Sequence, residues 1–267
     1  MDIFSLIGLI AGLGLVVFGM VSDGGSLIAF LSPSSFAIVF GGTFGALFIS
    51  YPFDTIKQIP SHLKLVFGKD NYNPIEYITQ ISDLAKVARK NGLLALEDKA
   101  AEIEDKFLAN SIMLIVDAID PDRVRKIFDS QLDYVQQRHD YTIGFYDRAA
   151  GLAPAFGMIG TVIGLINMLA NLNASDPDAL GAGMSVALIT TLYGSVMANL
   201  FFTPISNKLQ VIHEHEMLCM ELVVEGILSI QAGENPKHIE DKLISFLPEK
   251  SQEEFTEAPA GGNDEDR

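Results

Sequence analysis

The sequence predicts an all-α membrane protein with four transmembrane helices and a large helical cytoplasmic insert between spans two and three. All 18 Lys and Arg residues lie in two blocks, 53–148 and 204–267, whereas residues 1–52 and 149–203 contain none. Those two bare segments hold four apolar runs, each close to the roughly 20 residues needed to cross a bilayer. Because basic loops stay in the cytoplasm, the pattern places the insert and both termini there. Apolar runs of this length are uncommon in soluble folds, which disfavours a soluble core.

The first transmembrane hairpin is residues 1–52, with spans expected at about 3–21 and 33–51. The N-terminal run lacks the basic region of a secretory signal, and a second apolar run follows it at once, so we expect a retained span. Pro33 opens the second span and Pro52 helps to end it, because proline is tolerated at helix starts and disrupts helix interiors.

The insert, residues 53–148, is expected to be a cytoplasmic helical domain. Asn73 and Pro74 start an amphipathic helix whose apolar residues recur at helical spacing until Gly92. A second helix is expected over about 94–108.

Asp120 and Pro121 start the next predicted helix, with the aspartate as N-cap and the proline as the first helical residue. No other proline occurs before Pro154, and the single Gly144 between them is tolerable within a helix. We therefore expect one helix to run from the insert into the third span.

The second transmembrane hairpin is residues 149–203, with spans at about 149–172 and 182–202 joined by a short acidic loop. Cytoplasmic helices are expected over 204–248. The remaining segment, 249–267, is acidic and rich in Pro and Gly, which is typical of a disordered tail.

Charge and composition exclude several classes of function. The net charge of −16 argues against nucleic-acid binding, which needs a basic surface. Cys219 is the only cysteine, so there is no intrachain disulfide or multi-cysteine metal site. The sequence contains no nucleophile–base constellation or phosphate-binding loop, so we do not expect an enzyme. No Asp, Glu, Lys, Arg or His lies within any span, although ion pathways generally carry one. The chain is therefore either a passive scaffold or part of a channel whose titratable group comes from a partner.

Small residues are concentrated in spans three and four, where they let helix backbones approach closely. They are Gly157, Gly160, Gly164, Ala187, Gly194 and Ala198. They could serve packing within one subunit, but packing between subunits is favoured because the small positions spread around the helices.

Three hydroxyl side chains, Thr161, Thr190 and Thr191, lie at mid-membrane depth. Hydroxyl oxygens can bind a hard cation such as sodium, or each can bond a carbonyl one turn back. The residues alone favour the second interpretation. Pro154, early in span three, either bends the helix or is a tolerated irregularity near its end.

Four linked motifs carry a family resemblance. They are ARKNGLLALED at 88–98, LAPAFGMIGTVIGLINML at 152–169, ALITTLYGSVMANLFFTPISNKL at 187–209 and EGILSIQAGENP at 225–236. With them, the chain resembles the A subunit of the bacterial flagellar stator, the family that includes MotA, PomA and MotP, over nearly its whole length except the tail.

The resemblance implies an ion-conducting subunit of the bacterial inner membrane that couples sodium or proton flux to torque on the rotor switch ring, with the ion as cargo and no cofactor. It implies a pentamer of A subunits around two copies of a single-span, peptidoglycan-binding B subunit, which supplies an essential Asp. The related ExbB/TolQ energisers, which power envelope processes, are the alternative. A passive scaffold and a solute transporter are further alternatives; four spans leave the transporter little room for a polar cavity.

The resemblance also assigns roles to single residues. Pro154 and Pro204 match two prolines near the family's ion path. Arg89 and Glu97 match a charged pair implicated in rotor contact, and Lys90 matches a neighbouring cation. The three threonines fall where sodium-driven members carry threonine, which reverses the preference from the residues alone and predicts sodium drive.

Overall fold

The structure is a computed structural model that describes residues 3–22, 24, 26–68, 72–171 and 177–257. Within this described part, all regular secondary structure is helical. The chain divides into two compact units, each built from two separate segments. The membrane unit is Met1–Asp70 with Arg138–Val211, and the polar unit is Asn71–Gln137 with Ile212–Arg267.

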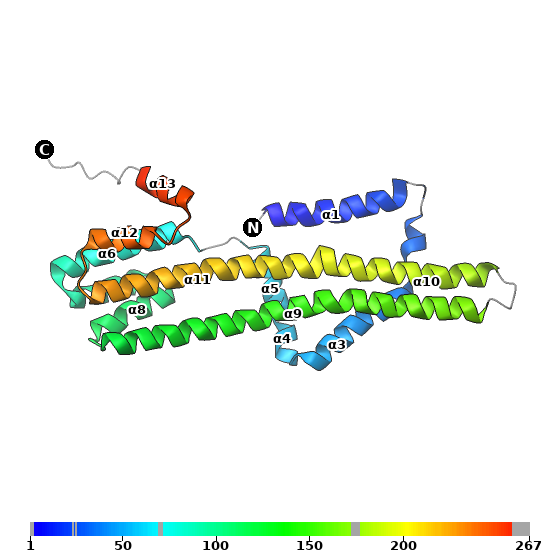
Figure 1. The fold of residues 1–267 in the computed structure, drawn as a ribbon, viewed down its shortest axis with the longest axis horizontal. Coiled ribbons are helices and arrows are strands. Elements are labelled where there is room, and N and C mark those ends of the chain that lie inside the picture. Colours follow the sequence, from blue (N-terminus) through cyan, green and yellow to red (C-terminus); the bar gives the residue numbers. More distant parts are fainter. Residues whose placement is uncertain (1–2, 23, 25, 69–71, 172–176, 258–267) are drawn as a thin grey trace. The chain divides into compact units, whose positions relative to one another are not determined.

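The membrane unit contains the apolar helices, most of which are labelled in Figure 1. Its elements before the polar unit are α1 (Ile3–Ser22), the 3-10 turn η1 (Leu27–Phe30), α2 (Pro33–Phe36), the π-helical segment η2 (Ala37–Gly41), α3 (Gly42–Ser50), α4 (Phe53–Lys57) and α5 (Ile59–Val66). Its later elements are the second part of α9 (Pro121–Ala170), α10 (Pro177–Val196), the π-helical segment η5 (Met197–Phe202) and the start of α11 (Thr203–Gln231). The short helices α4 and α5 thus belong to the membrane unit, although the sequence groups them with the insert.

The polar unit packs shorter amphipathic helices around the remaining parts of α9 and α11. These are α6 (Pro74–Asn91), the 3-10 turn η3 (Leu93–Ala95), α7 (Leu96–Glu102), α8 (Lys106–Val116), α12 (Pro236–Ile244) and α13 (Glu249–Glu257). Its core is aliphatic and aromatic, and the largest fully buried side chains include Phe128, Ile81 and Leu222.

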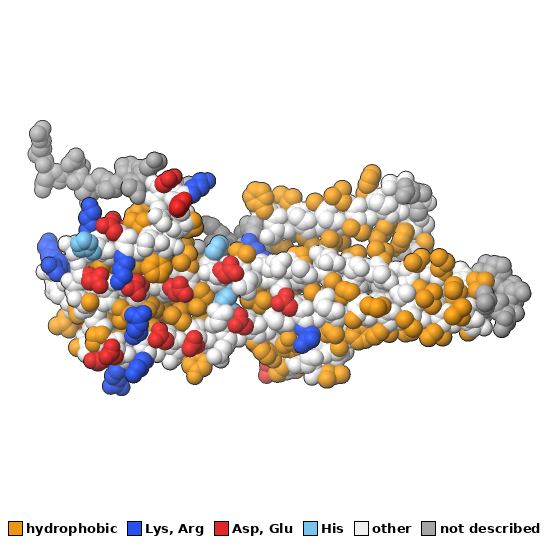
Figure 2. Space-filling model, in the orientation of Figure 1, with side chains coloured by type: hydrophobic (Ala, Val, Ile, Leu, Met, Phe, Trp, Pro, Cys, Tyr) orange, Lys and Arg blue, Asp and Glu red, His pale blue; other side chains and the backbone are white. Residues whose placement is uncertain are grey.

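Among the described residues, four helical stretches are long and apolar enough to cross a membrane, which confirms the predicted fold class. They are Ile3–Ser22, Leu27–Ser50, Pro121–Ala170 and Leu180–Gln231. Figure 2 shows the corresponding difference in surface: hydrophobic side chains cover α1, α10 and the end of α9, whereas charged side chains gather over the helices of the polar unit. The loop expected at 173–178 lies mostly outside the described residues.

Local signals in the sequence set most of the helix starts. The side chains of Ser32 and Asn73 cap α2 and α6 by accepting hydrogen bonds from the N–H groups of Ser35 and Ile75. The expected continuity into span three is confirmed, because α9 is one helix of 50 residues that includes Pro154.

Three expectations about local structure are wrong. The single helix expected over 94–108 is two helices, because the Asp105 carboxylate accepts a hydrogen bond from Leu108 N at 2.7 Å and starts α8 there. The helix of the fourth span, expected to end at about residue 202, does not end before Pro204: the π-helical turn η5 precedes this proline, and the chain continues as α11. The tail is not wholly irregular, since Glu249–Glu257 is helical and Phe255 packs against the core of the polar unit.

Candidate functional site

Glycines hold α9 against α10 at close range. A Cβ on Gly164 would lie 2.6 Å from Ala187 N and Gly183 O, and a Cβ on Gly194 would lie 2.6 Å from Ala153 O. A Cβ on Gly160 would meet the Thr190 side chain at 2.4 Å. These neighbours are mostly backbone atoms, so no larger residue fits at these positions without separating the helices.

The predicted small residues therefore all serve contacts within the chain. Gly157 also faces α10, since its Cβ would lie 2.9 Å from Thr190 O, and Ala187 and Ala198 are buried at 3% and 4% exposure. Packing within one subunit was the less favoured of the two uses that the sequence predicted for these residues. Packing between subunits stays a prediction for these residues.

The three threonines come together at this helix pair. The hydroxyls of Thr161, Thr190 and Thr191 lie 3.0, 3.0 and 3.1 Å from the carbonyl oxygen of Ala187. Thr161 Oγ1 and Thr191 Oγ1 are 2.6 Å apart. Thr190 is fully buried, whereas Thr191 is exposed in the single chain. We call these three side chains and the Ala187 carbonyl the hydroxyl cluster.

Hydrogen bonds to the preceding turn leave lone pairs available on the oxygens of the hydroxyl cluster. Thr161 and Thr190 can donate to the carbonyls of Gly157 and Val186, at 3.1 and 2.9 Å. A hydroxyl has one proton and two lone pairs, so a threonine that donates to its own helix still presents lone pairs to its surroundings. The two interpretations of these threonines are therefore compatible, and the oxygens of the cluster match the ligands of hard cations.

The two prolines have different surroundings. Pro154 faces α10, because a Cβ on Gly194 would lie 3.1 Å from the Pro154 Cα. Its ring nitrogen cannot donate to the carbonyl of Ala150, so α9 lacks one backbone hydrogen bond beside the α10 contact. Pro204 is exposed and lines a cavity with α1 and α5. The structure thus brings Pro154, but not Pro204, to the α9–α10 interface through an observed contact.

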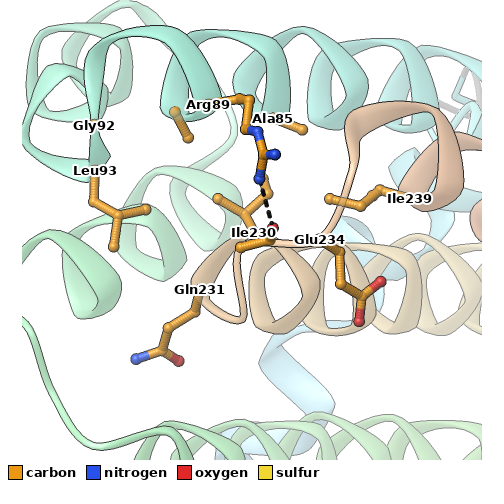
Figure 3. Close-up of a pocket in the computed structure, with 10 residues that line it drawn as sticks. Ala85, Arg89, Gly92, Leu93, Ile230, Gln231, Glu234 and Ile239 are labelled. Atoms are coloured by element: carbon orange, nitrogen blue, oxygen red, sulfur yellow. Dashed lines mark hydrogen bonds between the residues drawn. The ribbon is translucent and has the colours of Figure 1, made fainter.

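Arg89 lies in the last turn of α6 and crosses to the end of α11. Its Nη1 donates to the carbonyl of Gly233 at 3.1 Å (Figure 3). Gly233 has a φ of 74°, a left-handed conformation that ends α11, and the N–H groups of Gly233 and Glu234 donate to the carbonyls of Ile230 and Ser229. A positive charge beside the C-terminal end of a helix is favourable, so this contact orients the guanidinium at a surface hollow of about 270 Å³.

Lys90 and Glu97 are both exposed, and no ion pair within the described residues engages either side chain. Lys90 lies at the end of α6 and Glu97 in the first turn of α7, with the turn η3 between the two helices. Nearby, Lys99 donates to Glu102 at 2.8 Å, and this hydrogen bond raises the pKa of Lys99. The surface around Arg89, Lys90 and Glu97 is therefore water-exposed and carries charges of both signs.

Sequence reasoning missed two partners of the predicted site residues and one contact between spans. The carbonyls of Ala187 and Gly233 leave no signal in the sequence, because every residue has one. Tyr193 Oη donates to Phe30 O at 2.5 Å and joins α10 to the start of the second span. An apolar run containing one tyrosine did not predict that contact.

Comparison with known proteins agrees with this architecture. Residues 6–92 match the family described as "Motility protein A N-terminal", and residues 99–222 match the "MotA/TolQ/ExbB proton channel family". Motility protein A of Borreliella burgdorferi is 40% identical over 98% of this chain and 100% of its own length. The chain belongs to the MotA/PomA family.

Further relatives of this MotA/PomA family member extend the agreement. Chemotaxis protein PomA of Vibrio alginolyticus is 38% identical, over 93% of this chain and 96% of its own. The solved flagellar MotAB stator complex from Bacillus subtilis aligns with a TM-score of 0.86 and 33% identity, covering 95% of this chain and 100% of that chain. The match at residues 6–92 to the motility-protein model favours the stator branch over the energiser branch.

Proposed function

We propose that this protein is the A subunit of a flagellar motor stator, which conducts sodium and converts its flux into torque on the rotor switch ring. The observation that carries the ion choice is the hydroxyl cluster between α9 and α10. Three hydroxyl oxygens and one carbonyl oxygen converge there within an apolar helix pair. Oxygen donors in water-poor surroundings suit a hard cation, whereas a proton path has no need of such a cluster.

The spans lack ionisable side chains, so a partner must bring the titratable group. We infer that a single-span, peptidoglycan-binding B subunit places an aspartate near the hydroxyl cluster, and that five A subunits surround two B subunits. The solved complex to which this chain is similar is named a MotAB stator complex, which supports a B partner. The distribution of Lys and Arg supports cytoplasmic termini in the inner membrane.

Arg89, Lys90 and Glu97 are proposed to contact the rotor. Lys90 and Glu97 are exposed and carry opposite charges, while the bond to Gly233 holds the Arg89 guanidinium in place. Charges at such an interface mainly set encounter and register rather than affinity.

The test is rotation of tethered cells that carry this chain and its B partner as their only stator. We expect rotation to stop in sodium-free medium and to return when sodium is added. Thr190→Ala and Thr191→Ala should each weaken the response to sodium. Thr142→Ala is the matched control, because its hydroxyl donates to a carbonyl four residues back at 3.1 Å but lies outside the cluster. Full speed without sodium, or an unchanged sodium response in Thr190→Ala, would refute sodium drive.

A further inference from the structure

One flank of α9 in the polar unit carries a surface hollow of about 440 Å³ that the proposed rotor contacts do not use. The residues that line it follow one another at helical spacing along α9. They are Arg123, Lys126, Ile127, Ser130, Gln131 and Tyr134. None of them is acidic. Tyr134 is 72% exposed, so no element of the single chain covers its aromatic ring.

The two cations of the hollow are unpaired. Neither Arg123 nor Lys126 takes part in an ion pair or a side-chain hydrogen bond within the described residues. The acids of the same stretch of α9, Asp129 and Asp133 among them, occupy other positions of the helical turn and therefore lie on another flank. The hollow thus presents positive charge beside an exposed aromatic ring, which suits a partner surface that is acidic and partly apolar.

The complementary charge is on α11, the other long helix of the polar unit. His213 Nε2 lies 3.1 Å from Gln136 Oε1, and Gln231 Nε2 donates to the Ile119 carbonyl at 2.7 Å. The two helices are therefore antiparallel, and the hollow and Glu221 lie at the same height, halfway between these two contacts. Glu221 is exposed and, in the part of the chain that the structure describes, has no ion pair.

The hollow and Glu221 can meet between two copies of the chain. Two different surfaces that complement each other make a head-to-tail contact, and such a contact closes into a ring when the rotation between copies allows it. Because α9 continues into the third span as one helix, the axis of a ring around a membrane-spanning partner runs along the long helices. Rotation about that axis keeps every residue at its height, so Glu221 of one copy is level with the hollow of the next.

We propose that the hollow on α9 binds the Glu221 face of α11 of a second copy of this chain. The inference rests on the ring of A subunits proposed above and assigns that ring a contact in the polar unit. The carboxylate of Glu221 binds the cations of Arg123 and Lys126. Met217, which is half-exposed and one turn before Glu221, is level with Tyr134 and covers its ring, a contact that sulfur and aromatic groups favour.

The experiment is disulfide cross-linking, in membranes, of the complex with its B partner. Two chains with different tags are produced together, one with Ser130→Cys in the hollow and the other with Glu221→Cys. The native Cys219 is 1% exposed and gives no background. We expect a band of twice the chain mass that carries both tags, and no such band when either chain is produced alone. Arg125→Cys is the matched control: it is exposed on the same helix but does not line the hollow, so it should not cross-link to Glu221→Cys.

Charge reversal tests the ion pairs of the contact. Native mass spectrometry of the diluted complex gives the concentration at which A subunits dissociate. Lys126→Glu should raise that concentration by about fivefold, the factor for one exposed ion pair, and adding Glu221→Lys should restore the parent value. Arg125→Glu removes an equally exposed cation of α9 outside the hollow and should match the parent.

Several results would overturn the proposal. A band between two Ser130→Cys chains would mean a two-fold contact of the hollow with itself, and the absence of a band with both tags would exclude Glu221. Failure of Glu221→Lys to rescue Lys126→Glu would exclude their pairing. The copy number from mass spectrometry separates these failures from failure of the proposed function. Several A copies per complex without the cross-link would overturn only this contact, whereas a single A copy would overturn the ring as well.

Discussion

The contact of Gly164 with α10 predicts a large effect from one added methyl group. In Gly164→Ala, the new Cβ would lie 2.6 Å from Ala187 N, whereas ordinary contacts begin at 3.4 Å. The helices would have to separate by about 0.8 Å (3.4 − 2.6), because both neighbours of the methyl group, Ala187 N and Gly183 O, are backbone atoms. Overpacking of this kind costs about 1–3 kcal/mol.

Alanine also favours a helix over glycine by about 0.5–1 kcal/mol, so a control must remove that gain. Gly151→Ala provides it: Gly151 lies in the same helix, and its Cβ would meet nothing within 4 Å. The difference between the two variants should then be close to the overpacking cost of about 1–3 kcal/mol. The separation would also move Ala187, whose carbonyl anchors the hydroxyl cluster, so Gly164→Ala should reduce sodium-dependent rotation.

The assay is unfolding by sodium dodecyl sulfate in dodecylmaltoside micelles, followed by far-ultraviolet circular dichroism. We expect Gly164→Ala to unfold at a lower fraction of dodecyl sulfate than the parent, and Gly151→Ala at an equal or higher one. If both variants unfolded at the same fraction, the close approach of α9 and α10 would not be a feature of the folded protein.

Three further predictions concern the polar groups. Arg89→Ala should lower the free energy of unfolding by about 0.5–1.5 kcal/mol, because it loses the hydrogen bond to the Gly233 carbonyl. Lys90→Ala is the control, and its thermal denaturation should match that of the parent. Equal effects of the two substitutions would contradict a role of Arg89 in capping the end of α11. Burial lowers the pKa of His62 below 6.5, so the folded state favours the neutral ring. The contribution of His62 to the free energy of unfolding is therefore complete above pH 6.5 and is lost as the pH falls below that value. The unfolding midpoint of His62→Asn should therefore fall less steeply below pH 6.5 than that of the parent, and parallel pH curves would refute this. Cys219 is 1% exposed, so N-ethylmaleimide should label it only after denaturation, and rapid labelling of the native protein would show that the polar unit opens.

Much of the fold was predictable because it depends on local or one-dimensional signals. An N-cap residue followed by proline marks the starts of α6 and α9. The absence of charged residues marks the spans. The split between α7 and α8 was missed, because the Asp105 cap lies inside a sequence that otherwise reads as one helix. The continuation of the helix through Pro204 was also missed. The π-helical turn η5 lies directly before it and accommodates a residue that a regular α-helix would not.

The sequence by itself determined that this chain has four apolar spans without Asp, Glu, Lys, Arg or His, and its linked motifs assigned it to a family. It also identified the three threonines as candidates: the residues alone favoured a bond to the preceding turn, whereas the family resemblance favoured an ion site. The tertiary structure decided that they share one carbonyl, because α9 and α10 are antiparallel and the glycines between them permit close contact. It also decided that Arg89 reaches Gly233, which is 144 residues away in the chain. Such contacts between residues of different helices depend on how the helices pack, which the periodicity within one helix does not specify.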